Sequence, residues 1–489
     1  MQRNPKSSGS HPRRSGTMPA TRLRVLVCSV LAVLSAGCQT QAPPARPEMQ
    51  KQAQQSLELP SAWKAGGEAS PVADYWLATF GDPQLDALVA EAIAKNPDLR
   101  VTATKVEQAG QYVEMAKATL LPAVNLFGTG GTNMGGGDAL QLISLGVSWE
   151  IDLWGRLRYG RNAAEETYAS SQADFEFARQ SLAATTAKSW FTASETWLQQ
   201  QIAEDMVKSS QQLLALAEKR LDVGIGNEKE VALARANLGT FQDSAKQIRL
   251  AHEQAIRALE VLLGRYPAAE LQARHDLAKL PGPVPAGMPL QSLERRPDLI
   301  AAERRVAAAF NRVGEAKAAQ LPRLNLNANI AAISSDILQL RDDFDNPTGG
   351  IGANLLAPIY QGGALKTQVE IRTLEQKQAL AEYARMALRA LSDVENALAT
   401  AQNLAEREQL LQRAVTDNRR ALELEQTSYR VGKTDLRAGQ QQQLNLYAAS
   451  VALLGVQGEQ LAQRVNLHLA LGGSFETPLT LKLATELGK

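Results

Sequence analysis

Cysteine, histidine and aromatic residues are scarce in this chain. Its 489 residues include two Cys, four His and 5% aromatic residues. Metal and redox sites need several Cys or His side chains at short spacings. His252, His275 and His468 are instead far apart in the sequence. The scarcity argues against a zinc or redox site, and no metal site is predicted.

An excess of charge of one sign is also lacking over most of the chain. The total is 52 Lys+Arg against 51 Asp+Glu, but the first 37 residues hold six basic residues and no acidic one. The remaining chain therefore has 46 basic and 51 acidic residues, a net charge of −5. A mildly acidic body without a basic cluster argues against nucleic acid as a partner.

Catalytic motifs are missing as well. No GxSxG element, paired metal ligands or P-loop stands at a strand–helix junction. The Gly-rich run Gly128–Gly137 lacks the GK[ST] that phosphate binding requires, and it falls in a predicted hairpin loop. We predict no enzymatic activity and no cofactor.

Proline is absent from two long stretches, residues 123–266 and 359–477. Because proline is excluded from helix interiors, both stretches permit very long helices. We predict helices at Leu157–Asp222 and Ala364–Arg430, the first about 100 Å long at 1.5 Å per residue. Each reaches a Val-Gly turn and returns, through Asn227–Leu263 or Thr434–Leu471. Two helical hairpins result, although a cytoskeletal coiled coil stays open on this evidence.

The amino end has the features of a bacterial lipoprotein signal. Arg22 and Arg24 precede the apolar run Val25–Ala36, and Gly37 stands directly before Cys38. This run is too short to span a bilayer as a helix. We predict cleavage before Cys38 and its acylation, palmitate included, so that this covalent lipid is the only added group. Gln39, where an inner-membrane retention signal has Asp, favours delivery to the outer membrane.

The chain contains an internal duplication. Asn96-Pro97-Asp98-Leu99 matches Arg296-Pro297-Asp298-Leu299 at a separation of 200 residues, and Leu121-Pro122 matches Leu321-Pro322. Further along, the separation becomes 208, and Val223-Gly224 matches Val431-Gly432. Ordered Pro and Gly landmarks make chance similarity between Ala-rich segments a poor explanation.

Between the long helices the hydrophobic period changes to two. Residues 143–153 alternate strictly between apolar and polar side chains, and residues 323–330 alternate too. Val124–Gly130 and Gly350–Ile359 are weaker strand partners, which completes one β-hairpin per repeat. Such strands fit a transmembrane β-barrel or a half-buried soluble sheet. The aromatic residues predicted at the membrane interface are Trp149, Trp154 and Tyr360.

Four strands leave two open edges. In lipid each unpaired backbone group costs several kcal/mol, so an open sheet is unstable there. Single-chain barrels start at about eight strands. Other copies of the chain must therefore complete the sheet, although this reasoning alone leaves the copy number open.

An ordered set of motifs resembles the TolC-like outer-membrane factor family, in its lipoprotein efflux branch (NodT- and OprM-like members). The resemblance runs from about residue 75 to residue 473. The matching segments are Phe80-Gly81-Asp82-Pro83-Gln84-Leu85-Asp86-Ala87-Leu88-Val89, Asn96-Pro97-Asp98-Leu99, Ser148-Trp149-Glu150-Ile151-Asp152-Leu153-Trp154-Gly155-Arg156, Glu294-Arg295-Arg296-Pro297-Asp298-Leu299 and Pro358-Ile359-Tyr360-Gln361-Gly362-Gly363.

The resemblance implies an α+β membrane protein with two structural repeats, each a β-hairpin plus a long α-helical hairpin. A homotrimer would form a 12-stranded barrel through the outer membrane, continued by a periplasmic helical barrel with a mixed α/β equatorial belt. The corresponding segments are a signal peptide (1–37), an acylated tether (38–74), a first repeat (75–264, with strands at about 122–153 and a helical hairpin at 157–264), an equatorial linker (265–289), a second repeat (290–473, with strands at about 322–359 and a helical hairpin at 364–471) and a C-terminal equatorial segment (474–489).

The resemblance also implies a passive exit duct for drugs or other small toxic compounds. The duct would receive them from a periplasmic adaptor (a membrane fusion protein) and an inner-membrane transporter of the RND type. Antibiotic resistance is the expected phenotype. The alternatives left open are a duct for type I protein secretion, and a periplasmic adaptor or structural coiled-coil lipoprotein.

Family members dock adaptors and constrict at their periplasmic helix tips. The corresponding tip residues are Arg220, Val223, Gly224, Tyr429, Arg430, Val431 and Gly432. A purely structural role as turn residues is equally open for the two glycines. The aperture candidates are Glu228, Glu230, Lys433, Asp435 and Arg437, and we expect Asp435 and Arg430 to join inter-hairpin contacts. Ala438 and Gln441 stand where the best-known members carry an acidic ring, so that ring is not transferable.

Overall fold

The computed structural model describes residues 41–45, 47–48, 60–67, 70, 72, 74–131, 141–334 and 347–476. The predicted signal peptide and Cys38 lie outside these residues. The chain divides into two compact units. The first comprises Met1–Pro43, Glu114–Ala163 and Phe310–Leu374, and the second comprises Pro44–Val113, Ala164–Ala309 and Glu375–Lys489.

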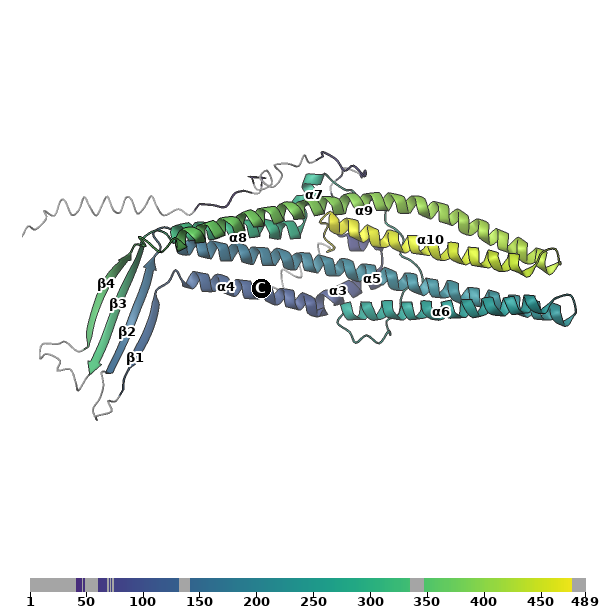
Figure 1. Ribbon diagram of the computed structural model, residues 1–489, viewed down its shortest axis with the longest axis horizontal. Helices are drawn as coiled ribbons and strands as arrows, with labels where there is room; N and C mark the ends of the chain where they lie inside the picture. The colour runs from purple at the N-terminus through teal and green to yellow at the C-terminus, as the bar shows by residue number, and fades with distance from the viewer. Residues whose placement is uncertain are drawn as a thin grey trace, which may run out of the picture. The chain divides into compact units, whose positions relative to one another are not determined.

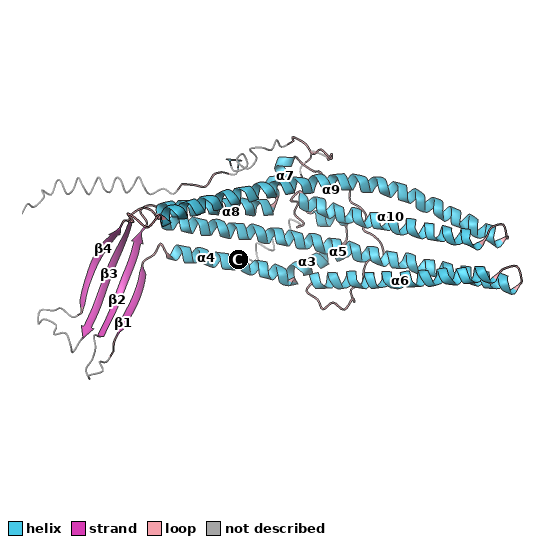
Figure 2. Cartoon of the chain, viewed as in Figure 1, coloured by secondary structure: helices cyan, strands magenta, loops and turns pink. Residues whose placement is uncertain are grey.

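The first unit contains one antiparallel sheet of four strands in the order β1-β2-β3-β4, drawn in magenta in Figure 2. The strands are β1 (Ala123–Thr129), β2 (Gln141–Ile151), β3 (Arg323–Ser334) and β4 (Thr348–Leu356). Each predicted hairpin forms. In addition β2 pairs with β3, Leu145 opposite Ile330, and this pairing joins the two repeats.

Alternation gives the sheet one apolar and one polar face. Leu145, Val147 and Trp149 share a face of β2, and their partners on β3 are Ile330, Ala328 and Leu326. This face is uncovered in the single chain, since Ile351 is 90% exposed and Leu126 is 73% exposed. The opposite face carries mainly Ser, Asn and Gly. One apolar and one polar face are what a barrel wall between lipid and water requires.

A compact junction joins β2 to the helix α5 (Arg156–Asp222). The Asp152 carboxylate accepts hydrogen bonds from the backbone N–H groups of Leu157 (3.1 Å) and Arg158 (3.0 Å), which caps the first turn. The Arg156 guanidinium binds both carboxylate oxygens of Glu150, at 3.1 and 2.8 Å. These contacts fix the backbone between the end of β2 and the first turn of α5.

The predicted interface tryptophans lie at this corner. The Trp149 indole N–H donates to the Leu120 carbonyl (2.9 Å), and that of Trp154 donates to the Pro322 carbonyl (2.8 Å). Pro322 belongs to the duplicated Leu-Pro segment of the second repeat, and Leu120 directly precedes that of the first. Both tryptophans therefore brace a strand corner. An interfacial role for them and for Tyr360 stays a prediction.

Two long helical hairpins form as predicted, with slightly different ends. Helix α5 has 67 residues and is followed by α6 (Glu228–Leu262), while α9 (Ala364–Arg430), also 67 residues, is followed by α10 (Leu436–Ala470). Figure 1 shows α9 and α10 running side by side as one hairpin. The side chains of Asn227 and Asp435 accept hydrogen bonds from Glu230 N and Ala438 N, so both return helices start later than predicted. Among the described helices, none has both the length and the apolar composition that crossing a membrane requires.

Among the described residues, three shorter helices precede the strands of the first repeat and two precede those of the second. They are η1 (Trp76–Phe80), α3 (Pro83–Lys95), α4 (Pro97–Ala118), α7 (Pro289–Arg295) and α8 (Pro297–Ala318). The duplicated Pro-Asp-Leu segments start α4 and α8, with proline at the first helical position, where a missing N–H costs nothing. The sequence analysis found these segments without assigning them to helices.

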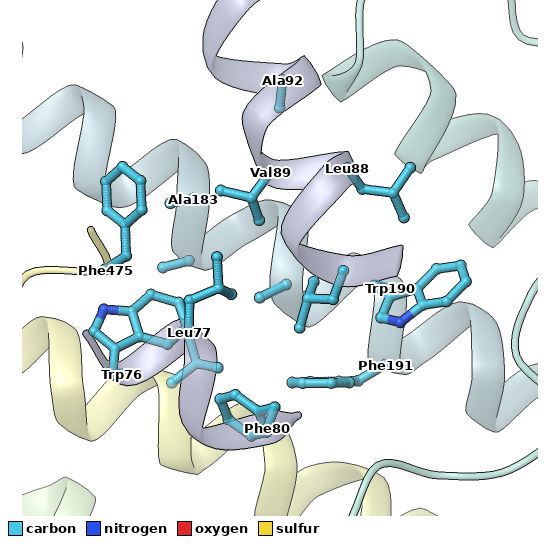
Figure 3. Packing of buried hydrophobic residues seen from close by; sticks show 14 of the residues in the cluster. Trp76, Leu77, Phe80, Leu88, Val89, Ala92, Ala183, Trp190, Phe191 and Phe475 are labelled. Carbon is cyan, nitrogen blue, oxygen red and sulfur yellow. The ribbon is translucent and has the colours of Figure 1, made fainter. Parts of the chain in front are cut away.

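The largest core cluster of the second unit surrounds the segment that begins at Phe80. Figure 3 shows Trp76, Phe80, Trp190 and Phe191 gathered in it, and the Phe80 and Phe191 rings lie 5.0 Å apart. Asp82 is buried beside them. Its carboxylate caps α3 and accepts a hydrogen bond from the Trp190 indole (2.9 Å), and Arg274 lies 3.2 Å from it. Phe80 and Asp82 thus hold η1 and α3 against α5.

Each return helix ends at a joint with the helix start of its own repeat. In the first repeat the Asn96 side-chain amide donates to the Leu262 carbonyl (3.0 Å). In the second, Arg296 donates to the Ala470 carbonyl (3.3 Å). Gly264 follows at the first joint with φ 68°. A Cβ there would stand 2.8 Å from the Lys95 carbonyl oxygen, so both the conformation and the close approach require glycine.

Candidate functional site: the helix tips

The two hairpin tips have the same backbone turn. Gly224 and Gly432 adopt φ values of 78° and 74°, a left-handed conformation that glycine tolerates best. After Gly224, the N–H of Ile225 donates to the Arg220 carbonyl (3.0 Å). At the equivalent place, Lys433 N–H donates to the Ser428 carbonyl (2.9 Å). These bonds satisfy the last carbonyls of α5 and α9, and the glycines are required as turn residues.

Arg220 and Tyr429 connect the two tips. The Arg220 guanidinium carbon lies 4.7 Å from the centre of the Tyr429 ring, and one guanidinium nitrogen donates to the Tyr429 carbonyl (3.2 Å). The Tyr429 hydroxyl donates to a carboxylate oxygen of Glu230 (3.2 Å). The structure thus joins α5, α6 and α9 through three of the predicted residues, in a contact set that we call the tip latch: Arg220, Glu230 and Tyr429.

The tip latch is closely packed. Tyr429 is 2% exposed and lies in a cluster with Ala217, Val231, Ala234 and Leu436. Burial, and after it the Glu230 carboxylate, raises the pKa of Tyr429 to about 12. The hydroxyl therefore remains a donor over the whole physiological pH range. Sequence reasoning placed Glu230 and Tyr429 in separate groups, because only folding brings α6 beside the end of α9.

The outer surface of the tips is apolar and cationic. Val223 and Val431 are each 63% exposed, and Ile225, which sequence reasoning missed, is 65% exposed. Its position one residue beyond the Val-Gly pair was the available signal. Arg430 and Lys433 are exposed beside Val431. Adaptor contact at these residues stays a prediction.

The other aperture candidates do not join the latch. The Asp435 carboxylate caps α10 by accepting from the Ala438 N–H (3.2 Å). Glu228 and Arg437 are exposed in the first turns of α6 and α10. Within the described part of this single chain, the side chains of Arg430 and Asp435 make no hydrogen bond or ion pair between hairpins, so the expected role of these two residues stays a prediction.

No group of His, Cys, Asp and Glu side chains in the described ranges is arranged to hold a metal ion. The features that indicate a function are the sheet and the helical hairpins. An open-edged sheet with one apolar face, and two long helical hairpins that meet at their tips, define a subunit of an oligomeric membrane channel.

The chain belongs to the outer membrane efflux protein family, whose model matches residues 88–265 and 288–473, more than half of its length. It is 31% identical over 444 residues to the pyoverdine export outer membrane protein OpmQ of Pseudomonas aeruginosa, covering 86% of this chain and 92% of the relative. It is 30% identical over 413 residues to the cation efflux system protein CusC of Escherichia coli O6:H1, covering 82% and 88%.

Solved structures of outer-membrane channels have a similar fold. The outer-membrane channel OprN superposes with a TM-score of 0.77 at 25% identity, covering 89% of this chain and 100% of that one. The CmeC channel of Campylobacter jejuni has the same fold, with a TM-score of 0.79 at 22% identity and coverage of 92% and 98%. The predicted resemblance, fold class and outer-membrane efflux function are confirmed.

Proposed function

We propose that three copies of this chain assemble into a 12-stranded barrel through the outer membrane, with a helical duct that extends into the periplasm. The open-edged sheet carries this proposal. Its edge strands β1 and β4 have no partner on one side within the described part of the chain. Lipid cannot satisfy those backbone groups, and neighbouring copies can.

The proposed trimer is the passive exit duct of a tripartite efflux system. A periplasmic adaptor and an RND-type inner-membrane transporter supply the compounds and the energy, and drugs or other small toxic molecules leave through the duct. The relatives named above are described as export or efflux proteins. That description favours efflux over type I protein secretion. No catalysis and no cofactor are part of the proposal; the covalent lipid on Cys38 anchors the chain.

The proposed closing element is the tip latch. Tyr429 of the second hairpin contacts both helices of the first, through its carbonyl to Arg220 of α5 and through its hydroxyl to Glu230 of α6. Breaking these contacts lets the second hairpin move away from the first and widens the periplasmic entrance. Adaptor binding at the exposed residues Val223, Val431 and Arg430 would favour the same movement.

Tyr429→Phe together with Arg220→Ala tests the latch in planar bilayers. We expect single-channel conductance to increase severalfold, because each lost hydrogen bond removes about 1 kcal/mol from the closed form. Arg420→Ala is the matched control. It removes an exposed arginine of α9 that pairs locally with Glu423 (3.2 Å) and should leave conductance unchanged. Equal conductance in all three proteins would contradict the latch.

Deletion in the native host tests the duct itself. The deletion strain should become more sensitive to dyes, antibiotics or detergents, and the intact gene should restore tolerance. A Cys38→Ser variant separates the lipid anchor from the duct. Failure to secrete a protein, with unchanged sensitivity to small compounds, would favour the type I secretion alternative.

A further inference from the structure

The tips of the two repeats differ in charge. Residues 219–230 of the first repeat hold three basic and three acidic residues, a net charge of zero. The equivalent residues 427–438 hold three basic residues (Arg430, Lys433 and Arg437) and one acidic residue (Asp435), a net charge of +2. Both windows contain a tip turn, so the two halves of the duplicated fold present different electrostatic surfaces at the same place.

The cations of the second tip are uncompensated. Arg430, Lys433 and Arg437 are exposed, and in the described part of the chain their side chains make no ion pair or hydrogen bond. The one acidic residue of the window 427–438, Asp435, directs its carboxylate to the first turn of α10. In the first tip, by contrast, Arg220 is stacked on Tyr429 and Glu230 accepts from its hydroxyl.

The polar face of the sheet carries a further uncompensated positive charge. Over the described strands it carries mainly amides, hydroxyls and glycines, among them Ser148 and Asn327, and its only charged residues are Glu150 and Arg323. Glu150 is neutralised by Arg156 at 2.8 Å. Arg323 makes no ion pair among the described residues. Apart from Arg323 at the start of β3, the face that would line the barrel is therefore neutral, which leaves one uncompensated cation per chain.

We propose that the assembled channel prefers anions to cations, and that Arg430, Lys433 and Arg437 of the second tip are the main determinants, with Arg323 as a weaker one. The inference rests on the proposed trimeric duct, in which the second tips alone contribute three sets of these cations to one entrance. Charge of one sign around a narrow mouth concentrates counter-ions there. The cargo class that such an entrance favours is small organic anions, such as carboxylates.

Reversal potentials in planar bilayers under a KCl gradient test the proposal with the full-length channel. We expect a chloride-to-potassium permeability ratio of about 3 near 0.1 M salt, approaching about 1 near 1 M, where the screening length falls to about 3 Å. The triple variant Arg430→Gln, Lys433→Gln, Arg437→Gln should lower the ratio to about 1 at low salt. Arg323→Gln should lower it by a smaller amount.

A second triple variant is the matched control: Lys95→Gln, Lys208→Gln and Arg420→Gln. It removes the same formal charge from exposed residues that pair within their own helices, with Glu91, Asp205 and Glu423. Its ratio should equal that of the wild type.

The outcomes separate the inference from the proposed function. A conducting wild-type channel that prefers potassium, or that shows no preference, overturns the inference and leaves the duct intact. An unchanged ratio in the tip variant overturns the assignment of these residues. A protein that inserts in the bilayer and conducts no ions, even with the latch broken by Tyr429→Phe and Arg220→Ala, contradicts the proposed function, and the inference fails with it.

Discussion

The two repeats build the same joint from different side chains. Asn96 and Arg296 occupy equivalent positions, and each donates to the carbonyl of an equivalent residue, Leu262 or Ala470. The amide of Asn96 makes a neutral contact. The guanidinium of Arg296 is buried and also pairs with Asp298 (2.8 Å) and Asp393 (3.2 Å). The duplicated backbone geometry thus persists while the chemistry that holds it has diverged.

The last turns of the return helices diverge in the same way. Glu260 of α6 accepts hydrogen bonds from three successive backbone N–H groups, those of Ala269, Glu270 and Leu271. Its counterpart in α10 is His468, whose ring stacks on Trp76 at 5.9 Å. One repeat therefore uses a carboxylate to fold back the chain that follows, and the other uses a neutral ring to fill the core.

The largest expected effect concerns the joint ion pairs. Arg296→Ala leaves two carboxylates without their cation, and we expect it to lower the free energy of unfolding by about 3 to 5 kcal/mol. Asn96→Ala removes one neutral contact and should cost about 1 kcal/mol. Thermal unfolding of the detergent-purified protein, followed by far-ultraviolet circular dichroism, measures both. Equal losses would show that the two joints are energetically equivalent.

The next effect is pH dependence. Burial, and after it the positive charge of Arg464, lowers the pKa of His468 to about 4, against about 6.5 in an unfolded chain. The folded state therefore resists protonation. The contribution of neutral His468 to the free energy of unfolding is complete above pH 6.5 and falls as the pH drops towards 4. The total loss is about 3 kcal/mol. His468→Phe keeps a ring beside Trp76 and should abolish this loss.

Glu260 supplies the control for that experiment. Burial opposes its ionisation, but the three N–H donors outweigh burial and lower the pKa of the carboxyl below 4.5. Its contribution to stability is thus present above pH 4.5 and lost only below it. Glu260→Gln should leave the slope between pH 6.5 and 4.5 unchanged. If stability no longer depended on pH in this variant, the pH dependence would belong to Glu260 of the first repeat and not to His468 of the second.

The smallest effects concern glycine. Gly264→Ala and Gly472→Ala combine positive φ with contact at the joints, 2.8 Å to the Lys95 carbonyl oxygen and 3.1 Å to the Arg295 carbonyl carbon. We expect each to cost about 2 kcal/mol. At the tip, nothing lies within 4 Å of a Cβ on Gly432, so Gly432→Ala should cost about 1 kcal/mol. Midpoints of guanidinium unfolding rank the three variants, and a costlier tip substitution would reverse the comparison.

Much of the fold was predictable because its signals are periodic and local. Proline-free stretches delimited the long helices, and the end of α9 at Arg430 agrees with the prediction. Strict alternation located β2 at Gln141–Ile151, within two residues of the predicted ends. The glycines of the tips were identified from the Val-Gly repeat. Helices α4 and α8 were missed, although the proline at the first helical position of each was an available signal.

The site was less predictable than the fold. Val223 and Val431 were identified as tip residues from their place in the turn, and they are exposed there. The pairing of Tyr429 with Glu230 was not foreseen, because 199 residues separate them. Asp435 was expected to bridge hairpins, and in the single chain it caps its own helix, a local use that an acid before a helix start commonly has.

The sequence by itself determined which stretches form the long helices, the strands and the tip turns, because proline exclusion, two-residue alternation and glycine turns act over neighbouring residues. The tertiary structure alone decided the pairing of β2 with β3, the stacking of Arg220 on Tyr429 and the insertion of Asp82 between Trp190 and Arg274. These contacts join residues about 100 to 210 positions apart. No local preference specifies such partners; they are selected when whole faces pack together and buried polar groups must find donors and acceptors.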